Sequence, residues 1–511
     1  MILPDSSLYE VSYHSRYSPL KEAQRHVDAL LSGKRPAIVF IIGGGINYIS
    51  AVIAERFPNA VRVSLQPCDD FLGHEVDTPT RNWHPSSILS LRETIRQALA
   101  SNRIAGGVMI VEWPPVVNRF QELTEKIRIV LRDILEEASS NAATTGYWAA
   151  RWLHNSMRFV TSASSTAGLT PGASLVVIAC AGPSLASVIP EILDRRSSMA
   201  LWALASAIPA LQRFGLIPDL AIATDPGFWN GAHLRAAFFS KIPIAMPPSS
   251  YAPCDIMRHS RIVTLDTGLS FEKAAIQAAG ISSEGAIASG SVAGTALSLA
   301  LRLTNGPIAL AGYDLAAQGL MDHIQPYAFD ILDEKAENRL QSTYSTRASR
   351  VFEGYPSKEG EWRRSRAFTA YAGTIQVHEN DSPRVFRLGE SSVETCIRRA
   401  QFVDIPSGSN IAPRCIPDSL QKCITRAERD EAVRTMLKNL AEAASEQALD
   451  AIKNLEPLPY DAALYYKALA PRESAALIAE AARGEAKVDD IAMARIAARK
   501  AAASWLGARS C

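Results

Sequence analysis

The chain has 511 residues, of which 47% are hydrophobic and 21% charged, so it can bury ordinary cores without disulfides or bound metal. Lys and Arg number 53 against 52 Asp and Glu, a formal net charge of +1, which gives no overall attraction to nucleic acid or an anionic membrane. At roughly 150 residues per domain, the length indicates about three domains. The 29 glycines and 29 prolines exclude collagen-like and low-complexity chains.

The cysteines and the N-terminus indicate the compartment. The seven cysteines are scattered without a Cys-x-x-Cys pair, which disfavours a zinc ribbon and fits reduced thiols. Residues 1–6 lack the basic and apolar segments of a signal peptide. The uncharged stretch between Arg158 and Glu191 is interrupted by Ser, Thr, Gly and Pro, so no membrane span is expected. We expect a soluble, cytoplasmic protein.

The first region alternates apolar strands with helices. Ala37–Ile42 reads as a strand, Gly43–Gly45 as a turn and Asn47–Arg56 as a helix, with further strands at Val61–Leu65 and Gly107–Val111. This pattern predicts a parallel sheet covered on both faces, in a Rossmann-like domain with a helical connector over residues 1–160.

The end of its second strand argues against a nucleotide there. A nucleotide-binding Rossmann unit favours an acidic residue at this place, to hold ribose hydroxyls. The sequence has Gln66, and its first carboxylates follow at Asp69 and Asp70. We therefore favour a structural turn at Gly43–Gly45, while a ligand site stays open.

Helical periodicity over 120–134 and a second helix over Tyr147–Val160 form the connector. The Ser/Thr/Gly/Pro-rich stretch Thr161–Gly172 reads as a linker or long loop. A helical tail, rich in Ala, Glu, Arg and Lys, extends over Ala427–Leu506. We expect it to form a C-terminal domain over residues 420–511.

A second α/β region begins near Leu175 and predicts a doubly wound sheet in a central domain over residues 170–410. The expected strands are Leu175–Ala179, Met199–Ala203, Leu220–Thr224, Ile242–Ala245, Arg261–Leu265 and Pro307–Ala311. Helices at Pro209–Phe214 and Val292–Leu303 fit between them.

The turn Ala181–Leu185, Ala-Gly-Pro-Ser-Leu, follows the first of these strands. Gly182 lets the backbone approach a phosphate, and Ser184 either caps the next helix or bonds a ligand. The helix dipole favours an anion at that point. A plain turn explains the same residues, so both interpretations stay open.

Two further groups lie at the same predicted sheet edge, where ligands of open α/β sheets bind. Thr224 and Asp225 end a strand, and Asp225 either holds sugar hydroxyls or a metal, or caps the turn before Pro226. Gly290, Ser291 and Thr295 open a helix, where Ser291 is a good N-cap and small residues allow close approach.

The last strand leads into a further polar cluster. Gly312, Tyr313 and Asp314 follow it, and His323 and Tyr327 come shortly after. Histidine titrates near neutral pH, so His323 is a candidate general base for a hydroxyl, although most exposed histidines have no such role. The tyrosines are candidate donors to a departing phosphate.

Together, these motifs resemble the motility-associated factor (Maf) family of flagellin glycosyltransferases, mainly over residues 170–330. The motifs are Leu175–Leu185, Pro218–Pro226, Gly290-Ser291, and Gly312–Leu315 with His323. The sequence departs from the family at Tyr313, where Gln is common, and at Gln66, where an acidic residue is common.

The resemblance implies a sialyltransferase-like (GT-A-like variant) central domain. It implies transfer of a pseudaminic, legionaminic or sialic-acid-like nonulosonic acid from its CMP-activated donor to Ser or Thr of flagellin, in flagellum assembly and motility. The donor would contact Gly182, Pro183, Ser184, Thr224, Asp225, Gly290, Ser291, Thr295, Gly312 and Tyr313.

In the expected mechanism, the Gly182–Ser184 turn, Ser291 and a tyrosine such as Tyr327 stabilise the departing phosphate. His323 or Asp314 deprotonates the acceptor. No metal is expected, because CMP leaves with a single phosphate.

Two alternatives remain. The central domain is also similar to archaeal 6-hydroxymethylpterin diphosphokinases, which use ATP and Mg²⁺. A non-catalytic flagellin-binding assembly factor is the other alternative. The helical tail is expected to dock the acceptor or to form homo-oligomer contacts.

Overall fold

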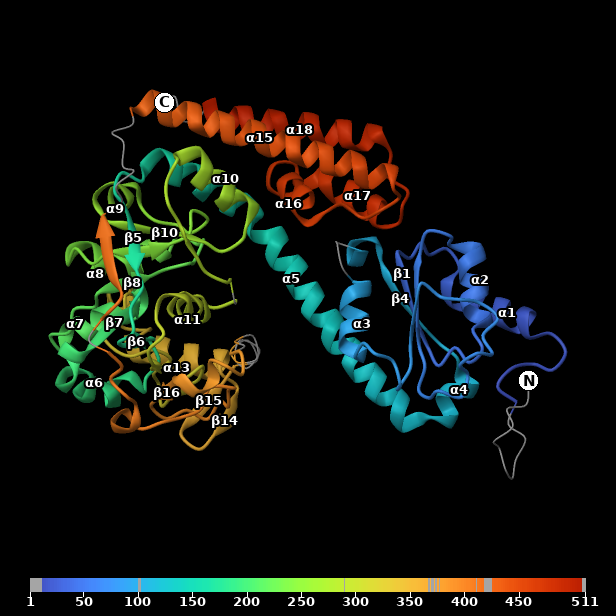
Figure 1. Cartoon of the computed structure of the whole chain (residues 1–511), viewed down its shortest axis with the longest axis horizontal. Helices are drawn as coiled ribbons and strands as arrows, with labels where there is room; N and C mark the ends of the chain where they lie inside the picture. Colours follow the sequence, from blue (N-terminus) through green and yellow to red (C-terminus); the bar gives the residue numbers. More distant parts are fainter. Residues whose placement is uncertain are drawn as a thin grey trace. The chain divides into compact units, whose positions relative to one another are not determined.

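A computed structural model covers the chain (Figure 1). It describes residues 12–99, 103–288, 290–365, 377–409, 411–417 and 425–507, together with Phe368, Ala372 and Ile375. The chain divides into two compact units, one of Met1–Ala150 with Leu437–Cys511 and one of Arg151–Met436. The three-domain division stays a prediction, and its expected boundary at 410–420 falls partly outside the described residues.

The first unit contains a four-stranded parallel sheet in the order β3-β2-β1-β4. The strands are β1 (Ile38–Ile42), β2 (Val61–Leu65), β3 (Arg81–Trp83) and β4 (Val108–Glu112). Helices α1 (Pro19–Leu31) and α2 (Tyr48–Arg56) pack on one face, and α3 (Leu91–Ala98) with the start of α5 packs on the other. The predicted Rossmann-like region is confirmed.

One long helix, α5 (Gln121–Ser162), follows the short α4 (Pro114–Arg119). It contains both helices expected in the connector, so the expected interruption before Tyr147 was wrong. The linker expected at Thr161–Gly172 was also wrong, because Thr166–Thr170 forms β5. This strand pairs in parallel with β10 (Ile262–Asp266) and antiparallel with β17 (Arg414–Pro417), whose partners lie far away in sequence.

The second unit is built on a large sheet in the order β16-β12-β6-β7-β8-β9-β10-β5-β17, with β11 (Glu284–Gly285) beside β10. The remaining strands are β6 (Leu175–Ala179), β7 (Met199–Leu204), β8 (Leu220–Ile222), β9 (Ile244–Met246), β12 (Ile308–Ala311) and β16 (Val385–Leu388). All neighbours on this path pair in parallel except β5 and β17. The predicted doubly wound sheet is confirmed, with the expected strand ends correct to within two residues.

Helices cover both faces of this sheet. One face, which includes Val177 and Leu201, packs against α6 (Leu185–Asp194), α7 (Ile208–Arg213), α8 (Asn230–Phe239) and α9 (Cys254–His259). The other, which includes Val176 and Trp202, packs against α11 (Val292–Leu303). Helix α10 (Ser270–Ala279) follows β10. Because strand side chains alternate between faces, continuously apolar strands supply both cores.

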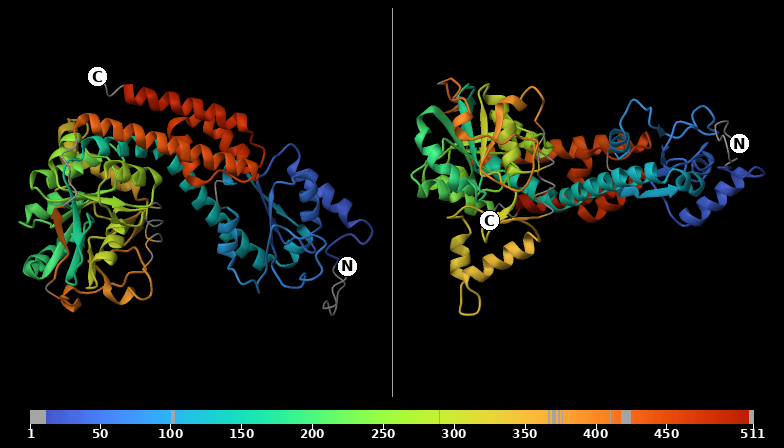
Figure 2. Two further views of the ribbon diagram at one scale, coloured as in Figure 1. Left: turned by 45° about the horizontal axis from the view of Figure 1, so that its top comes forward. Right: turned by 90° about the horizontal axis from the view of Figure 1, so that it is seen from below.

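A smaller subregion follows β12. Strands β13 (Ala317–Gln318), β14 (Ser357–Glu359) and β15 (Trp362–Arg364) form an antiparallel sheet. Helices α12 (Asp330–Ala336) and α13 (Thr343–Gly354) lie between β13 and β14, and Figure 2 shows them in gold, projecting from the body of their unit.

The C-terminal part is helical, as predicted. Its helices are α15 (Arg426–Lys453), α16 (Tyr460–Leu469), α17 (Pro471–Ala482) and α18 (Val488–Gly507). Ala482 of α17 contributes to the same core as Phe40 of β1. Over the described residues, we find no helix with the length and apolar character needed to cross a membrane.

Candidate functional site

The loops that follow β6 and β12 are fastened to each other. Asp314 is 2% exposed; its Oδ2 accepts the Ser184 N–H at 2.7 Å and its Oδ1 accepts the Ser184 hydroxyl. Burial raises the pKa of Asp314 to about 6, although the Ser184 hydrogen bonds oppose the shift. Both oxygens are engaged inside the protein, so the structure favours a bracing role over the expected role as base.

The remaining backbone donors of the Gly182–Ser184 turn are also used internally. Gly182 N–H donates to Gly312 O at 2.9 Å, and Leu185 N–H donates to Gly182 O at 3.1 Å. Pro183 has no N–H. A Cβ on Gly182 would lie 2.5 Å from Asp314 Oδ2, so glycine is needed here for close packing. The amides of this turn therefore already have acceptors within the protein, and phosphate binding by the turn stays a prediction.

Gly312, with a positive φ of +70°, forms the turn that leads from β12 into Tyr313 and Asp314. Tyr313 is 3% exposed and packs in the core beneath α11. Burial raises its pKa, and its hydroxyl has no hydrogen-bond partner among the described residues. Tyr313 therefore faces the interior and does not join the polar cluster around His323.

The β8 loop presents its polar groups to solvent. Asp225 is exposed, with Oδ1 accepting the Gly227 N–H at 2.6 Å, while Thr224 is half-buried. Asn155 of α5 donates to the backbone O of Pro226 at 3.1 Å and of Ser249 at 2.9 Å, which holds the β8 and β9 loops together. The other carboxylate oxygen of Asp225 remains available at the surface.

At the start of α11, the predicted N-cap is confirmed. The Ser291 hydroxyl accepts the Gly294 N–H at 3.2 Å, and Gly290 is exposed with φ of +72°. Thr295 is 3% exposed and its hydroxyl lies 3.4 Å from Ser291 O, so it is directed into the protein. Gly290 and Ser291 are therefore the members of this motif that lie at the sheet edge.

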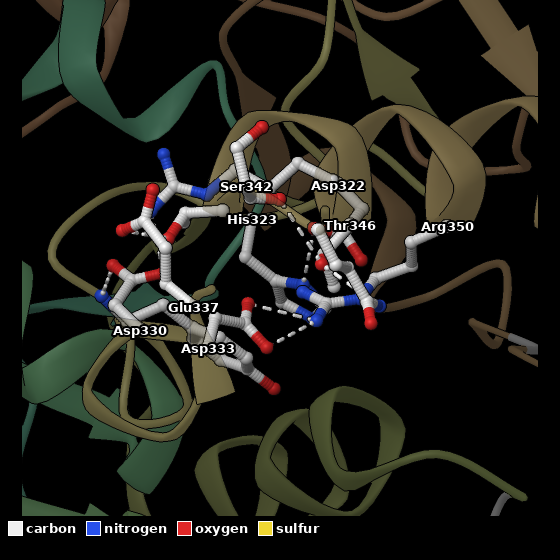
Figure 3. A network of polar contacts seen from close by, with 12 residues as sticks. Asp322, His323, Asp330, Asp333, Glu337, Ser342, Thr346 and Arg350 are labelled. Carbon is white, nitrogen blue, oxygen red and sulfur yellow. Dashed lines mark hydrogen bonds and ion pairs between the residues drawn. The ribbon is translucent and has the colours of Figure 1, made fainter. Parts of the chain in front are cut away.

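His323 lies in the loop between β13 and α12, which contacts the loop after β6. Figure 3 shows it beside Asp322. Its ring stacks on Tyr327 with centroids 4.1 Å apart. Its Nδ1 is 3.3 Å from Asp322 Oδ1, an ion-pair distance without hydrogen-bond alignment. Ile324 N–H donates to Ala181 O at 2.8 Å, which ties this loop to the β6 loop.

The carboxylate beside His323 is held ionised by its surroundings. Burial alone would raise the pKa of Asp322, but His323 and Arg350 outweigh that effect and lower it. Arg350 of α13 also binds both oxygens of Asp333 on α12, at 2.9 and 2.8 Å. A second pair, Arg347 and Asp330 at 3.1 Å, joins the same helices.

The sequence interpretation missed these arginines and also His233 of α8. The His233 ring lies 5.3 Å from Tyr327 and 4.7 Å from Phe329. Burial and the nearby His323 lower the pKa of His233 to about 4, so it is neutral at pH 7. The sequence signal for the arginines is their spacing: Arg347 and Arg350 are three residues apart, as are their partners Asp330 and Asp333.

Aromatic contacts connect this cluster with the β8 loop. Tyr327 packs edge-on against Phe329 at 5.3 Å, and Phe329 packs against Trp229 at 6.0 Å. The structure thus brings His323, Asp322 and Tyr327 together, beside the loop that carries Asp225. Within the described residues, we find no group of three or more His, Cys, Asp or Glu arranged to hold a metal ion.

The N-terminal glycine loop is filled by the protein's own side chains. A Cβ on Gly45 would lie 2.5 Å from His14 Nε2, which accepts the Ile46 N–H at 3.3 Å. The His14 ring stacks on Trp113 at 5.4 Å, so it occupies the crevice outside the ends of β1 and β4. These contacts agree with the structural turn favoured from the sequence.

Comparison with known proteins finds a family profile and a protein sequence that are similar to parts of this chain. Residues 151–319 match the profile of a family described as 6-hydroxymethylpterin diphosphokinase MptE-like. An uncharacterized protein of Treponema pallidum (strain Nichols) is 28% identical over 236 residues, which is 44% of this chain and only half of that protein's length.

Among solved structures, the Maf glycosyltransferase from Magnetospirillum magneticum AMB-1 matches 95% of this chain and 82% of its own, with a TM-score of 0.50 and 12% identity. At this identity the likeness concerns the fold. The chain has the fold of a Maf glycosyltransferase with an MptE-like central region, which confirms the resemblance inferred from the sequence.

Proposed function

We propose that this protein is a glycosyltransferase that moves a nonulosonic acid from its CMP-activated donor to a Ser or Thr hydroxyl of flagellin. The observation that carries the proposal is the His323–Asp322 pair at the carboxyl edge of a sheet with the Maf fold. Such edges are where open α/β sheets bind ligands.

The reaction needs a base for the acceptor hydroxyl. His323 Nδ1 faces Asp322, which leaves Nε2 to take the proton as the acceptor oxygen bonds to the anomeric carbon. The bond from that carbon to the phosphate oxygen breaks, and its electron pair leaves with CMP. Asp322 stabilises the imidazolium that forms, and the stacked Tyr327 fixes the ring plane.

Donor contacts are proposed for the residues that remain accessible. Asp225 has a carboxylate oxygen free for sugar hydroxyls, and Gly290 with Ser291 lies at the N-terminus of α11, where a phosphate is favoured. The proposal includes a cytoplasmic reaction, flagellin as the protein partner, and a role in flagellum assembly and motility.

One observation favours a second candidate. The central region matches an MptE-like profile, so transfer of diphosphate from ATP–Mg²⁺ to a hydroxymethylpterin is the alternative. A non-catalytic flagellin-binding factor is the third. The three candidates differ in the nucleotide that they bind, which is CMP, ATP or none.

Calorimetric titration separates them. We expect the purified chain to bind CMP and CMP-nonulosonic acid, with affinity for the donor reduced in Asp225→Ala. His323→Ala should retain CMP binding, because His323 acts on the acceptor. His259→Ala, an exposed histidine at the end of α9, is the matched control. Binding of ATP–Mg²⁺ alone would support the diphosphokinase, and binding of neither nucleotide would support the assembly factor.

A further inference from the structure

A cleft of about 900 Å³ runs along α11, on the face of the central sheet opposite α8. Leu297, Leu301 and Arg302 line one wall, and Ile287, from the segment after β11, lines the other. Lys273 of α10 and His378 complete its polar lining. The His323 cluster contacts α8 through His233, whereas the cleft lies along α11 and adjoins Gly290 and Ser291 at the start of that helix.

The walls of this cleft are braced by their own hydrogen bonds. Ile287 N–H donates to the Ser298 hydroxyl at 2.9 Å, which joins α11 to the opposite wall. Ala286 N–H donates to Asp266 O at 3.0 Å, and Thr267 N–H donates to Glu272 Oε2 at 2.8 Å. The polar groups of the lining backbone are thus largely satisfied, as in a preformed ligand site.

The charged side chains of the lining are not satisfied in this way. Lys273 and Arg302 are exposed, and neither forms an ion pair with a carboxylate of any described residue. The lining carboxylate, Asp266, accepts the Gly268 N–H at 2.9 Å. The cleft therefore combines unpaired cations with apolar walls, in a chain whose net charge is only +1.

We infer that this cleft binds an organic anion of about nucleotide size, with an apolar body against Leu297, Leu301 and Ile287 and a phosphate or carboxylate between Lys273 and Arg302. Ala288 and Gly294 of the cleft adjoin Gly290 and Ser291 of the proposed donor contacts. The site goes beyond those contacts, because Lys273 and Arg302, the cations that would hold the anion, are not among them. A volume of about 900 Å³ is at the upper end of the range for small-molecule sites.

The test uses 8-anilinonaphthalene-1-sulfonate as the anionic probe and N-phenyl-1-naphthylamine as the matched neutral probe with the same aromatic body. We expect saturable binding of the anionic probe that weakens with added NaCl. The double variant K273A/R302A should weaken it at least tenfold, the scale of one lost charge-assisted hydrogen bond. Binding of the neutral probe should stay unchanged.

Further variants test the cleft by a steric block that changes no charge, and show that probe binding does not depend on the proposed base. Ala288→Trp should block the cleft by size alone, because Ala288 is an exposed lining residue. Arg213→Ala on α7 and His323→Ala should bind the probe as the wild type does. Displacement by ADP or by naphthoate then tells a phosphate from a carboxylate ligand. Unchanged anionic-probe binding in K273A/R302A and Ala288→Trp, both with wild-type melting curves, would overturn the inference.

Discussion

Asp314 accepts both the backbone N–H and the hydroxyl of Ser184, although the two residues lie 130 positions apart. This pair joins the loops that follow β6 and β12, the two neighbouring strands from which the doubly wound sheet extends in opposite directions. The His323 loop is attached to the same β6 loop, because Ile324 N–H donates to Ala181 O.

Removing Asp314 should destabilise the central unit. Asp314→Ala leaves the buried Ser184 N–H and hydroxyl without their acceptor, which costs about 1–3 kcal/mol. Ser184→Ala removes one donor and should cost less, about 1 kcal/mol. Urea unfolding measures both losses, and equal stability of Asp314→Ala and the wild type would contradict the bracing role.

The Asp314 carboxyl group should also make the stability of the protein depend on pH. Its folded pKa of about 6 is above the ordinary 3.8, so the folded state holds this proton longer than the unfolded state. Its contribution to stability is complete below pH 4 and is lost as the pH rises to about 6. Relative to Asp314→Asn, the wild type should lose about 1–3 kcal/mol over that window. A pH-independent difference would contradict the assignment.

His14 should act in the opposite direction in the first unit. Burial lowers its folded pKa from 6.5 to about 4, so the unfolded state takes up the proton first as the pH falls. Stability should therefore decrease from pH 6.5 down to about 4, and His14→Gln should flatten that decrease in unfolding experiments. Equal acid sensitivity of both proteins would show that another group causes it.

Gly45 provides an independent test of the filled crevice. Its φ of +61° and the His14 ring 2.5 Å from any added Cβ both oppose a side chain. Gly45→Ala should cost more than about 1 kcal/mol, whereas Gly33→Ala, with φ of +72° but open space, should show only the backbone part. Thermal unfolding compares them, and equal losses would exclude steric conflict with His14.

Substitutions of His323 and of Asp322 should lower the kcat of transfer by different amounts. His323→Ala should lower kcat about 10²–10⁴-fold, because it removes the proposed base. Asp322→Asn keeps the shape of the side chain but removes the charge beside the imidazolium, so kcat should fall less and the donor KM should change little. Steady-state transfer measurements decide, and wild-type kcat in both variants would remove His323 from the mechanism.

Periodicity and apolar runs predicted much of the fold, because Leu175–Ala179 and Val292–Leu303 are buried elements with clear ends. The strand Thr166–Thr170 was not predicted, because its Thr and Gly content resembles a loop and its partner strands are distant in sequence. For the site, the predicted strands placed the polar loops that follow them at one edge of the sheet. Which side chains face one another there, as Ser184 and Asp314 do, depends on packing between distant segments that no local pattern records.

The most direct measurement of the central claim is the intact mass of flagellin incubated with the purified protein and CMP-nonulosonic acid. We predict a mass increase by whole nonulosonic acid residues with the wild type and with His259→Ala, and none with His323→Ala. An unchanged flagellin mass with the wild type, with intact donor confirmed in the same sample, would contradict the account.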